Sequence, residues 1–208
     1  MSCLLAINYF SCENKSTSKK TTTAKEVKIK KAFLTLNFGD SKKVVEGKLR
    51  YLQQDGNIYK STQFENQYIY LFDINKYGIK RAMAYITPHY YRNKLYKVEL
   101  TTLPFESDYQ YSQHIQKQDL DGISAPFENI KLYRDLHLAI SQLYIYKYGK
   151  YSSQIESDEA EGLFNRYWNN DNIRIEIEIV VGSLRINYID NDIIKLIKGK
   201  KISTKDAI

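Results

Sequence analysis

The feature that most constrains the fold is a strict alternation of apolar and charged side chains near the C-terminal end. Residues 172–181 read NIRIEIEIVV, and this period of two is that of a β-strand with one apolar face and one polar face. Gly182 and Ser183 then turn the chain into a second alternating stretch, residues 184–189. The pair predicts an antiparallel hairpin. The apolar positions of its first strand are Ile173, Ile175, Ile177 and Ile179.

Four more stretches have the composition of strands, namely residues 27–38, 67–74, 79–87 and 94–103. Asn75 to Gly78 is a suitable hairpin connection between the second and the third, and Arg92 with Asn93 turns the third into the fourth. In the stretch from Lys94, apolar and polar residues alternate. This pattern favours an antiparallel sheet with one face packed beneath helices and one face wet.

Two segments have the period of amphipathic helices. Residues 42–55 place Val45, Leu49 and Leu52 on one face, with Ser41 as N-cap and Gly56 at the end. Residues 129–148 form the clearest helix, which Gly149 ends. The predicted apolar stripe of that helix is Leu132, Leu136, Ala139 or Ile140, and Leu143. The fold class predicted from these elements is α+β, an antiparallel sheet with helices packed on one face.

The order of predicted elements suggests how the chain is divided. Helix and antiparallel strands follow one another in residues 27–103 and again in residues 129–190, so we predict two pseudo-repeated α/β-hairpin halves within one domain of residues 27–197. Residues 13–26 are rich in Ser, Thr and Lys and predict a flexible basic linker. Residues 198–208 are interpreted as a basic C-terminal tail.

The net charge of +7 belongs to the ends of the chain rather than to its body. Residues 13–31 contain seven Lys against two Glu, and residues 195–205 contain five Lys and no acidic residue. Residues 32–194 hold 19 basic and 21 acidic residues. A nucleic-acid groove needs basic residues clustered on the folded body, so we expect no nucleic-acid partner. Terminal lysines suit a solvated tether or attraction to an anionic membrane surface.

Both cysteines, Cys3 and Cys12, precede the predicted domain, which excludes an internal disulfide and a CxxC zinc site there. Residues 4–10 form a short apolar run, and the following Ser11-Cys12 is similar to a bacterial lipobox, in which a small residue precedes the lipidated cysteine. We therefore interpret residues 1–12 as a truncated signal and Cys12 as a lipidation site. This predicts a membrane-anchored protein of the bacterial cell envelope. The alternative is a cytoplasmic protein with two incidental cysteines.

Several stretches together carry a resemblance to a family. They are LNFGDSKKVVEGKL (residues 36–49), the KYG that ends the long helix (residues 147–149), Trp168, and the closing IRIEIEI and LRINYID strands (residues 173–190). In these features the chain resembles uncharacterised bacterial envelope lipoproteins with a tandem helix-plus-antiparallel-sheet domain. Similar tandem folds occur in proteins that inhibit or scaffold a partner protein, so the resemblance implies a protein or envelope component as partner.

The sequence shows no GxSxG, P-loop or GxGxxG motif, and its body has no Cys/His nucleophile pair. His89, His114 and His137 lack the spacing of metal ligands, and we expect no catalytic residue, metal or cofactor. Glu176 and Glu178 can be read as a carboxylate pair, but catalysis would also require a nearby acid and a cleft. We expect a non-catalytic binding or assembly module. A hydrolase with an unfamiliar site is an alternative.

Tyrosines dominate the candidate binding surface. Tyrosine suits interfaces because it combines an apolar ring with a hydrogen-bonding tip. We select Tyr90, Tyr91, Arg92 and Tyr96 as this surface. The alternative role of these rings is to fill or rim the core. A cytoplasmic inhibitor of the immunity type would use such a surface equally well, and it is the second functional interpretation.

Overall fold

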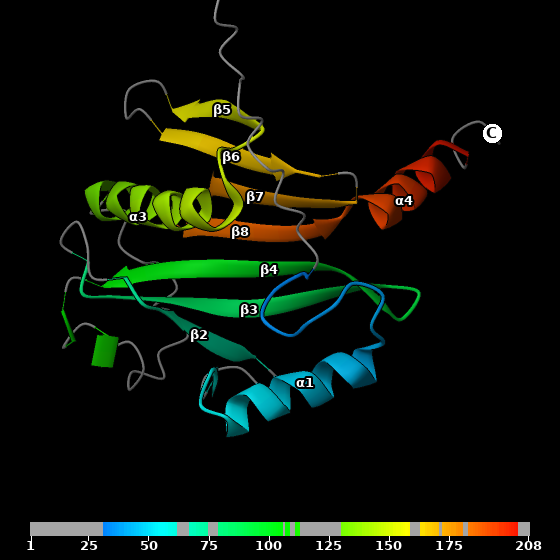
Figure 1. Cartoon of the computed structure of the whole chain (residues 1–208), viewed down its shortest axis with the longest axis horizontal. Helices are drawn as coiled ribbons and strands as arrows, with labels where there is room; N and C mark the ends of the chain where they lie inside the picture. The colour runs from blue at the N-terminus through cyan, green and yellow to red at the C-terminus, as the bar shows by residue number, and fades with distance from the viewer. Residues whose placement is uncertain are drawn as a thin grey trace, which may run out of the picture.

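The computed structural model describes residues 31–61, 67–74, 79–105, 107–108, 111–112, 130–158, 163–170, 172–180 and 183–203. Within these ranges the chain forms one antiparallel sheet of eight strands and three α-helices (Figure 1). The helices are α1 Lys42–Gln54, α3 Ile130–Tyr148 and α4 Asn191–Ser203. None of these helices is both long enough and apolar enough to cross a membrane.

The strands lie in the order β1–β2–β3–β4–β8–β7–β6–β5. Their bounds are β1 Tyr59–Lys60, β2 Tyr68–Phe72, β3 Arg81–Tyr91, β4 Lys94–Phe105, β5 Ser153–Asp158, β6 Leu163–Asn169, β7 Ile173–Val180 and β8 Ser183–Asp190. Along the chain α1 precedes β1 to β4, α3 precedes β5 to β8, and the two sets of strands join where β4 pairs with β8. The predicted α+β class is confirmed. The likeness of the two halves stays a prediction.

The first face of the sheet is apolar and carries α1 and α3 (Figure 1). The two helices form one buried cluster with apolar side chains of the strands. Its helical members include Val45, Leu49, Leu52, Leu136, Ala139 and Ile140, and its strand members include Leu100, Ile175, Ile177, Leu184 and Ile186. Burying one such side chain stabilises the fold by about 1.5–3 kcal/mol relative to exposing it. The hydrophobic face predicted for residues 42–55 is confirmed.

An aromatic group closes the core between α3 and the strands. The rings of Tyr144 and Trp168 have centroids 5.8 Å apart, and the hydroxyls of Tyr144 and Tyr188 are hydrogen-bonded to each other. Trp168 donates its indole N–H to the carbonyl of Gly149 at 2.9 Å. Buried tyrosine and tryptophan need such partners for their polar atoms. The KYG and Trp168 stretches therefore meet in the fold.

The strand predicted over residues 27–38 is wrong for its described part. Residues 31–40 form turns instead, with positive φ angles of 51° at Leu34 and 86° at Gly39. Leu36 is nevertheless fully buried, and its N–H donates to the carbonyl of Phe33 at 2.9 Å. The apolar residues of this stretch are buried by a compact turn over the core, so their burial did not require a strand. Residues 27–30 lie outside the described residues.

Other boundaries differ in smaller ways. Ser41 caps α1 as predicted, since its side chain accepts from the N–H of Val44 at 3.4 Å. The turn at Arg92 and Asn93 is confirmed, with φ angles of 49° and 63°. In α3 the stripe prediction is wrong at Leu143, which is 42% exposed, whereas Tyr144 is buried. β1, β5, β6 and α4 were not predicted from the sequence. The predicted connection at residues 75–78 lies outside the described ranges.

Candidate functional site

The second face of the sheet carries a network of charged and amide side chains across four neighbouring strands. Successive side chains of a β-strand point to opposite faces of the sheet, so the residues between the core-facing ones project from the second face. In register, Glu99 of β4 lies beside Asn187 of β8, which lies beside Glu176 of β7. Residues more than seventy positions apart are thus joined in one row. The full network is His89, Lys97, Glu99, Arg174, Glu176, Glu178, Arg185 and Asn187.

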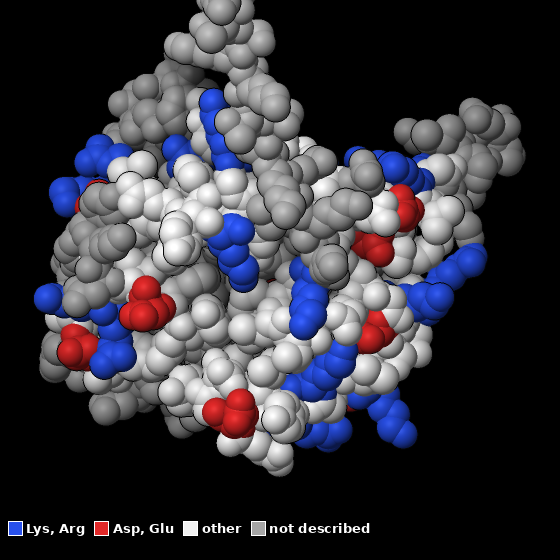
Figure 2. Space-filling view, in the orientation of Figure 1, with Lys and Arg blue, Asp and Glu red and all other residues white. Residues whose placement is uncertain are grey.

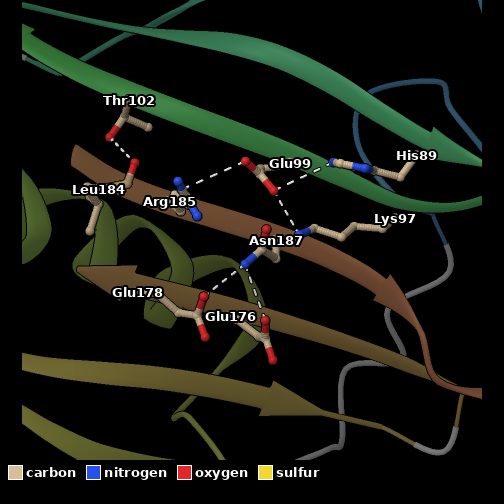
Figure 3. A network of polar contacts seen from close by, with 9 residues as sticks. All are labelled: His89, Lys97, Glu99, Thr102, Glu176, Glu178, Leu184, Arg185 and Asn187. Carbon is tan, nitrogen blue, oxygen red and sulfur yellow. Dashed lines mark hydrogen bonds and ion pairs between the residues drawn. The ribbon is translucent and has the colours of Figure 1, made fainter. Parts of the chain in front are cut away.

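Glu99 is the centre of the β4 side of this network (Figure 3). Its carboxylate lies 2.8 Å from Lys97 Nζ, 3.6 Å from His89 Nε2 and 3.8 Å from Arg185 Nε. The pKa of Glu99 falls to about 2, chiefly through His89 and then through Lys97 and Arg185, against the opposing effect of burial. Glu99 is therefore a carboxylate at every physiological pH.

Asn187 joins the two carboxylates of β7 (Figure 3). Its Nδ2 donates to Glu176 at 3.2 Å and to Glu178 at 3.1 Å. Arg174 also holds Glu176, with 2.8 Å between the guanidinium and the carboxylate. Burial, and then the charge of Glu178, raises the pKa of Glu176. Glu176 is 7% exposed, so the second face, which was predicted to be solvent-exposed, is buried at this residue.

The basic side chains of the network are more exposed than the carboxylates that hold them. The exposed fraction of the side chain is 43% for Arg185, 35% for His89 and 34% for Arg174, but 17% for Glu99 and 9% for Glu176. Long basic side chains keep their charged heads in water while their stems cover what lies beneath. A molecule that approached this face would therefore meet basic groups first.

The network does not satisfy all of its own polar atoms. Among the buried side-chain atoms of the described residues, His89 Nε2, Arg174 Nε, Arg185 Nε and Asn187 Oδ1 make no hydrogen bond. Buried polar groups are normally paired, so several unpaired atoms in one network require an explanation. The distances of 3.6 Å from Glu99 to His89 Nε2 and 3.8 Å to Arg185 Nε are also too long for hydrogen bonds, so both side chains are held loosely.

The two carboxylates of β7 are fixed by neighbouring side chains. Glu176 and Glu178 share one amide donor, and Arg174 neutralises the first of them, which is how a structural carboxylate pair is held. Among the residues that the structure describes, no group of three or more His, Cys, Asp or Glu could hold a metal ion. The arrangement can offer basic donors to an anionic or polar partner surface.

The selected surface at the β3–β4 turn is divided between two environments. Tyr91 and Arg92 are brought together, with the guanidinium 5.5 Å from the ring centroid. Tyr90 packs against the main core, where burial and Glu46 raise its pKa to about 12. The Tyr96 ring lies 6.4 Å from the His89 ring, beside the network.

The remaining candidates have other positions. His137 lies on α3 and is 1% exposed. Cys12 and His114 lie outside the described residues. Sequence reasoning selected neither Glu99 nor Asn187. Their signal was the polar half of the alternation in β4 and β8, but nothing in the sequence showed that these two strands are neighbours.

Comparison with known proteins adds no family to this picture. No protein-family model, no curated protein and no solved structure gives a significant match to the chain.

Proposed function

We propose that this chain is a non-catalytic binding module that holds a partner protein on the second face of its sheet. The observation that supports the proposal most directly is the layer of accessible basic groups above sheltered carboxylates at β3, β4, β7 and β8. Basic groups on an accessible face favour encounter with a surface of complementary charge. Arg185 and Arg174, whose side chains are 43% and 34% exposed, are the groups that a partner would engage first.

A photo-crosslinking residue tests this proposal. It replaces Asn169, an exposed residue of β6 that lies in register with Arg174. We expect irradiation of producing cells to give one discrete adduct, which is lost when Arg185→Glu is introduced. The matched control places the same residue at Tyr146, which is 93% exposed on α3. Equal adducts from both positions, or none from Asn169, would contradict a partner on the second face.

We also propose that the module is exported and lipid-anchored at Cys12. The support is sequence alone: an apolar run, Ser11-Cys12 and a polar tether in succession. We expect Cys12→Ala to move the protein from the membrane fraction to the soluble fraction, and the matched Cys3→Ala variant to stay with membranes. If the wild type and both variants are all found in the soluble fraction, the cytoplasmic, immunity-like interpretation replaces this one.

The hydrolase interpretation has a separate test. Glu176→Gln keeps the shape of the side chain and removes its charge. A hydrolase that used the Glu176 and Glu178 pair would lose its activity with this variant, whereas a binding module would keep its crosslinked partner.

A further inference from the structure

Helix α4 has a composition unlike that of the other helices. Its thirteen residues read NDIIKLIKGKKIS, with five Ile or Leu, four Lys and a single acidic residue, Asp192. The helix begins directly after β8, where the Asp190 carboxylate accepts from the N–H groups of Asp192 at 2.9 Å and Ile193 at 3.2 Å. The cap fixes the start of the helix to the end of the sheet.

The apolar side chains of α4 are partly covered, and Leu196 is the one among the described residues that is left exposed. The helix projects from the end of the sheet (Figure 1), and its main contacts are with β8. Ile193, Ile194 and Ile197 are half-buried, whereas Leu196 is 61% exposed. None of these four belongs to either apolar cluster of the described residues.

The order of residues along α4 separates apolar from basic groups in its first turns. Ile193, Leu196 and Ile197 are three and four positions apart and share one side of the helix. Lys195 and Lys198 lie on another side, and the Lys195 side chain is 72% exposed. In Figure 2, basic and acidic side chains are both visible where Figure 1 shows α4, and Asp192 is the one acidic residue of the helix. A basic helix with an exposed leucine beside its lysines has the residue types of a helix that lies against a membrane surface, and Leu196 is its exposed apolar group.

We propose that α4 binds the surface of an anionic lipid bilayer, with Leu196 toward the acyl chains and the lysines among the headgroups. Charge complementarity selects this occupant, because residues 195–205 contain five Lys and no acidic residue. The contact is separate from the lipid at Cys12, and it would hold the sheet in one orientation to the membrane. A lysine near such a surface strengthens binding roughly fivefold.

The test uses the full chain with Cys3→Ser and Cys12→Ser, so that no lipid anchor can form. Binding is measured by co-sedimentation with vesicles of phosphatidylglycerol and phosphatidylcholine, and with phosphatidylcholine alone. We expect binding only to the anionic vesicles. Lys195→Glu with Lys198→Glu should weaken it by about 25-fold or more. The matched control, Lys60→Glu with Lys80→Glu, makes the same change in charge at exposed sites outside α4 and should weaken binding far less.

A second variant separates insertion of the helix from attraction by net charge, which the unchanged lysines of residues 13–31 also supply. Leu196→Trp should show a blue-shifted emission when anionic vesicles are added, because its side chain leaves water. Equal weakening by the two lysine pairs, or Trp emission that vesicles leave unchanged, overturns the proposal. These outcomes are independent of Cys12→Ala in cells and of crosslinking from Asn169, so this inference and the proposed function can fail separately.

Discussion

Glu99 should make the stability of the fold depend on pH in a defined way. Its carboxylate is surrounded by Lys97, His89 and Arg185, and its pKa falls from 4.5 to about 2 on folding. At 1.36 kcal/mol per pH unit, this difference corresponds to about 3 kcal/mol of stabilisation at neutral pH. His89 and Arg185 are in contact with water, and solvent screening reduces the contribution to about 1–2 kcal/mol.

The direction follows from proton binding. The unfolded chain protonates Glu99 near pH 4.5, whereas the folded chain keeps the carboxylate charged down to about pH 2. Acid therefore favours the unfolded state between these two values. The contribution of Glu99 is complete above pH 5 and disappears as the pH falls through 2.

Urea unfolding of the wild type and of Glu99→Gln measures this contribution. At pH 7 we expect the variant to lose about 1–2 kcal/mol of unfolding free energy, because three basic groups lose their shared carboxylate. Toward pH 2 the two proteins should converge. Asp108→Asn is the control, since it removes an exposed ion pair with Arg81 and should change stability little. A constant difference between wild type and Glu99→Gln from pH 7 to pH 2 would refute the electrostatic reasoning.

Two further predictions concern the core beneath α3. Ile177→Ala removes a fully buried side chain and should lower the unfolding free energy by about 3 kcal/mol in urea, whereas Ile155→Ala, at a side chain that is 59% exposed, should change it by less than about 0.5 kcal/mol. Tyr144→Phe leaves the hydroxyl of Tyr188 without its partner and should cost about 1–2 kcal/mol. The double variant Tyr144→Phe with Tyr188→Phe should cost less than the sum of the single ones, and additive costs would show that the two hydroxyls do not depend on each other.

The parts of the fold that the sequence predicted well are those set by local period. In β7 the alternation of isoleucine with charged residues determines which side chains face the core, whatever the neighbouring strands are. In α1 the spacing of Val45, Leu49 and Leu52 has the same property, and Ser41 adds a cap that acts within one turn. In both cases the information lies within a dozen residues.

The parts that failed depend on the rest of the molecule. The stretch around Leu36 has strand-like residues, but a positive φ angle at Leu34 turns the chain back on itself. β5 is an edge strand whose first three residues are all exposed, so no apolar face marks it in the sequence. α4 was interpreted in part as a tail because lysines fill its second half.

The candidate site was the hardest part to predict, for a topological reason. Glu99 and Asn187 become neighbours only because β4 pairs with β8, which reverses the strand order in the second half of the sheet. The alternation within β4 and within β8 identifies which residues of each strand are polar. The partners of those polar residues follow from register across the sheet, and a period cannot specify register between strands so far apart.

The accessible basic groups of the second face are confined to a few strands, because the composition of this face changes across the sheet. Over β2, β3 and the far end of β4, a small apolar cluster of Ile69, Met83, Tyr85 and Phe105 is in contact with Tyr111. Toward β8 and β7 the side chains become charged, and there the accessible groups are the heads of Arg174 and Arg185. The side chains of the apolar cluster are packed against one another. The guanidinium groups of Arg174 and Arg185 can instead form ion pairs with carboxylates of a partner protein. A partner on this face should therefore contact β4, β8 and β7, and its complementary residues should be acceptors rather than donors.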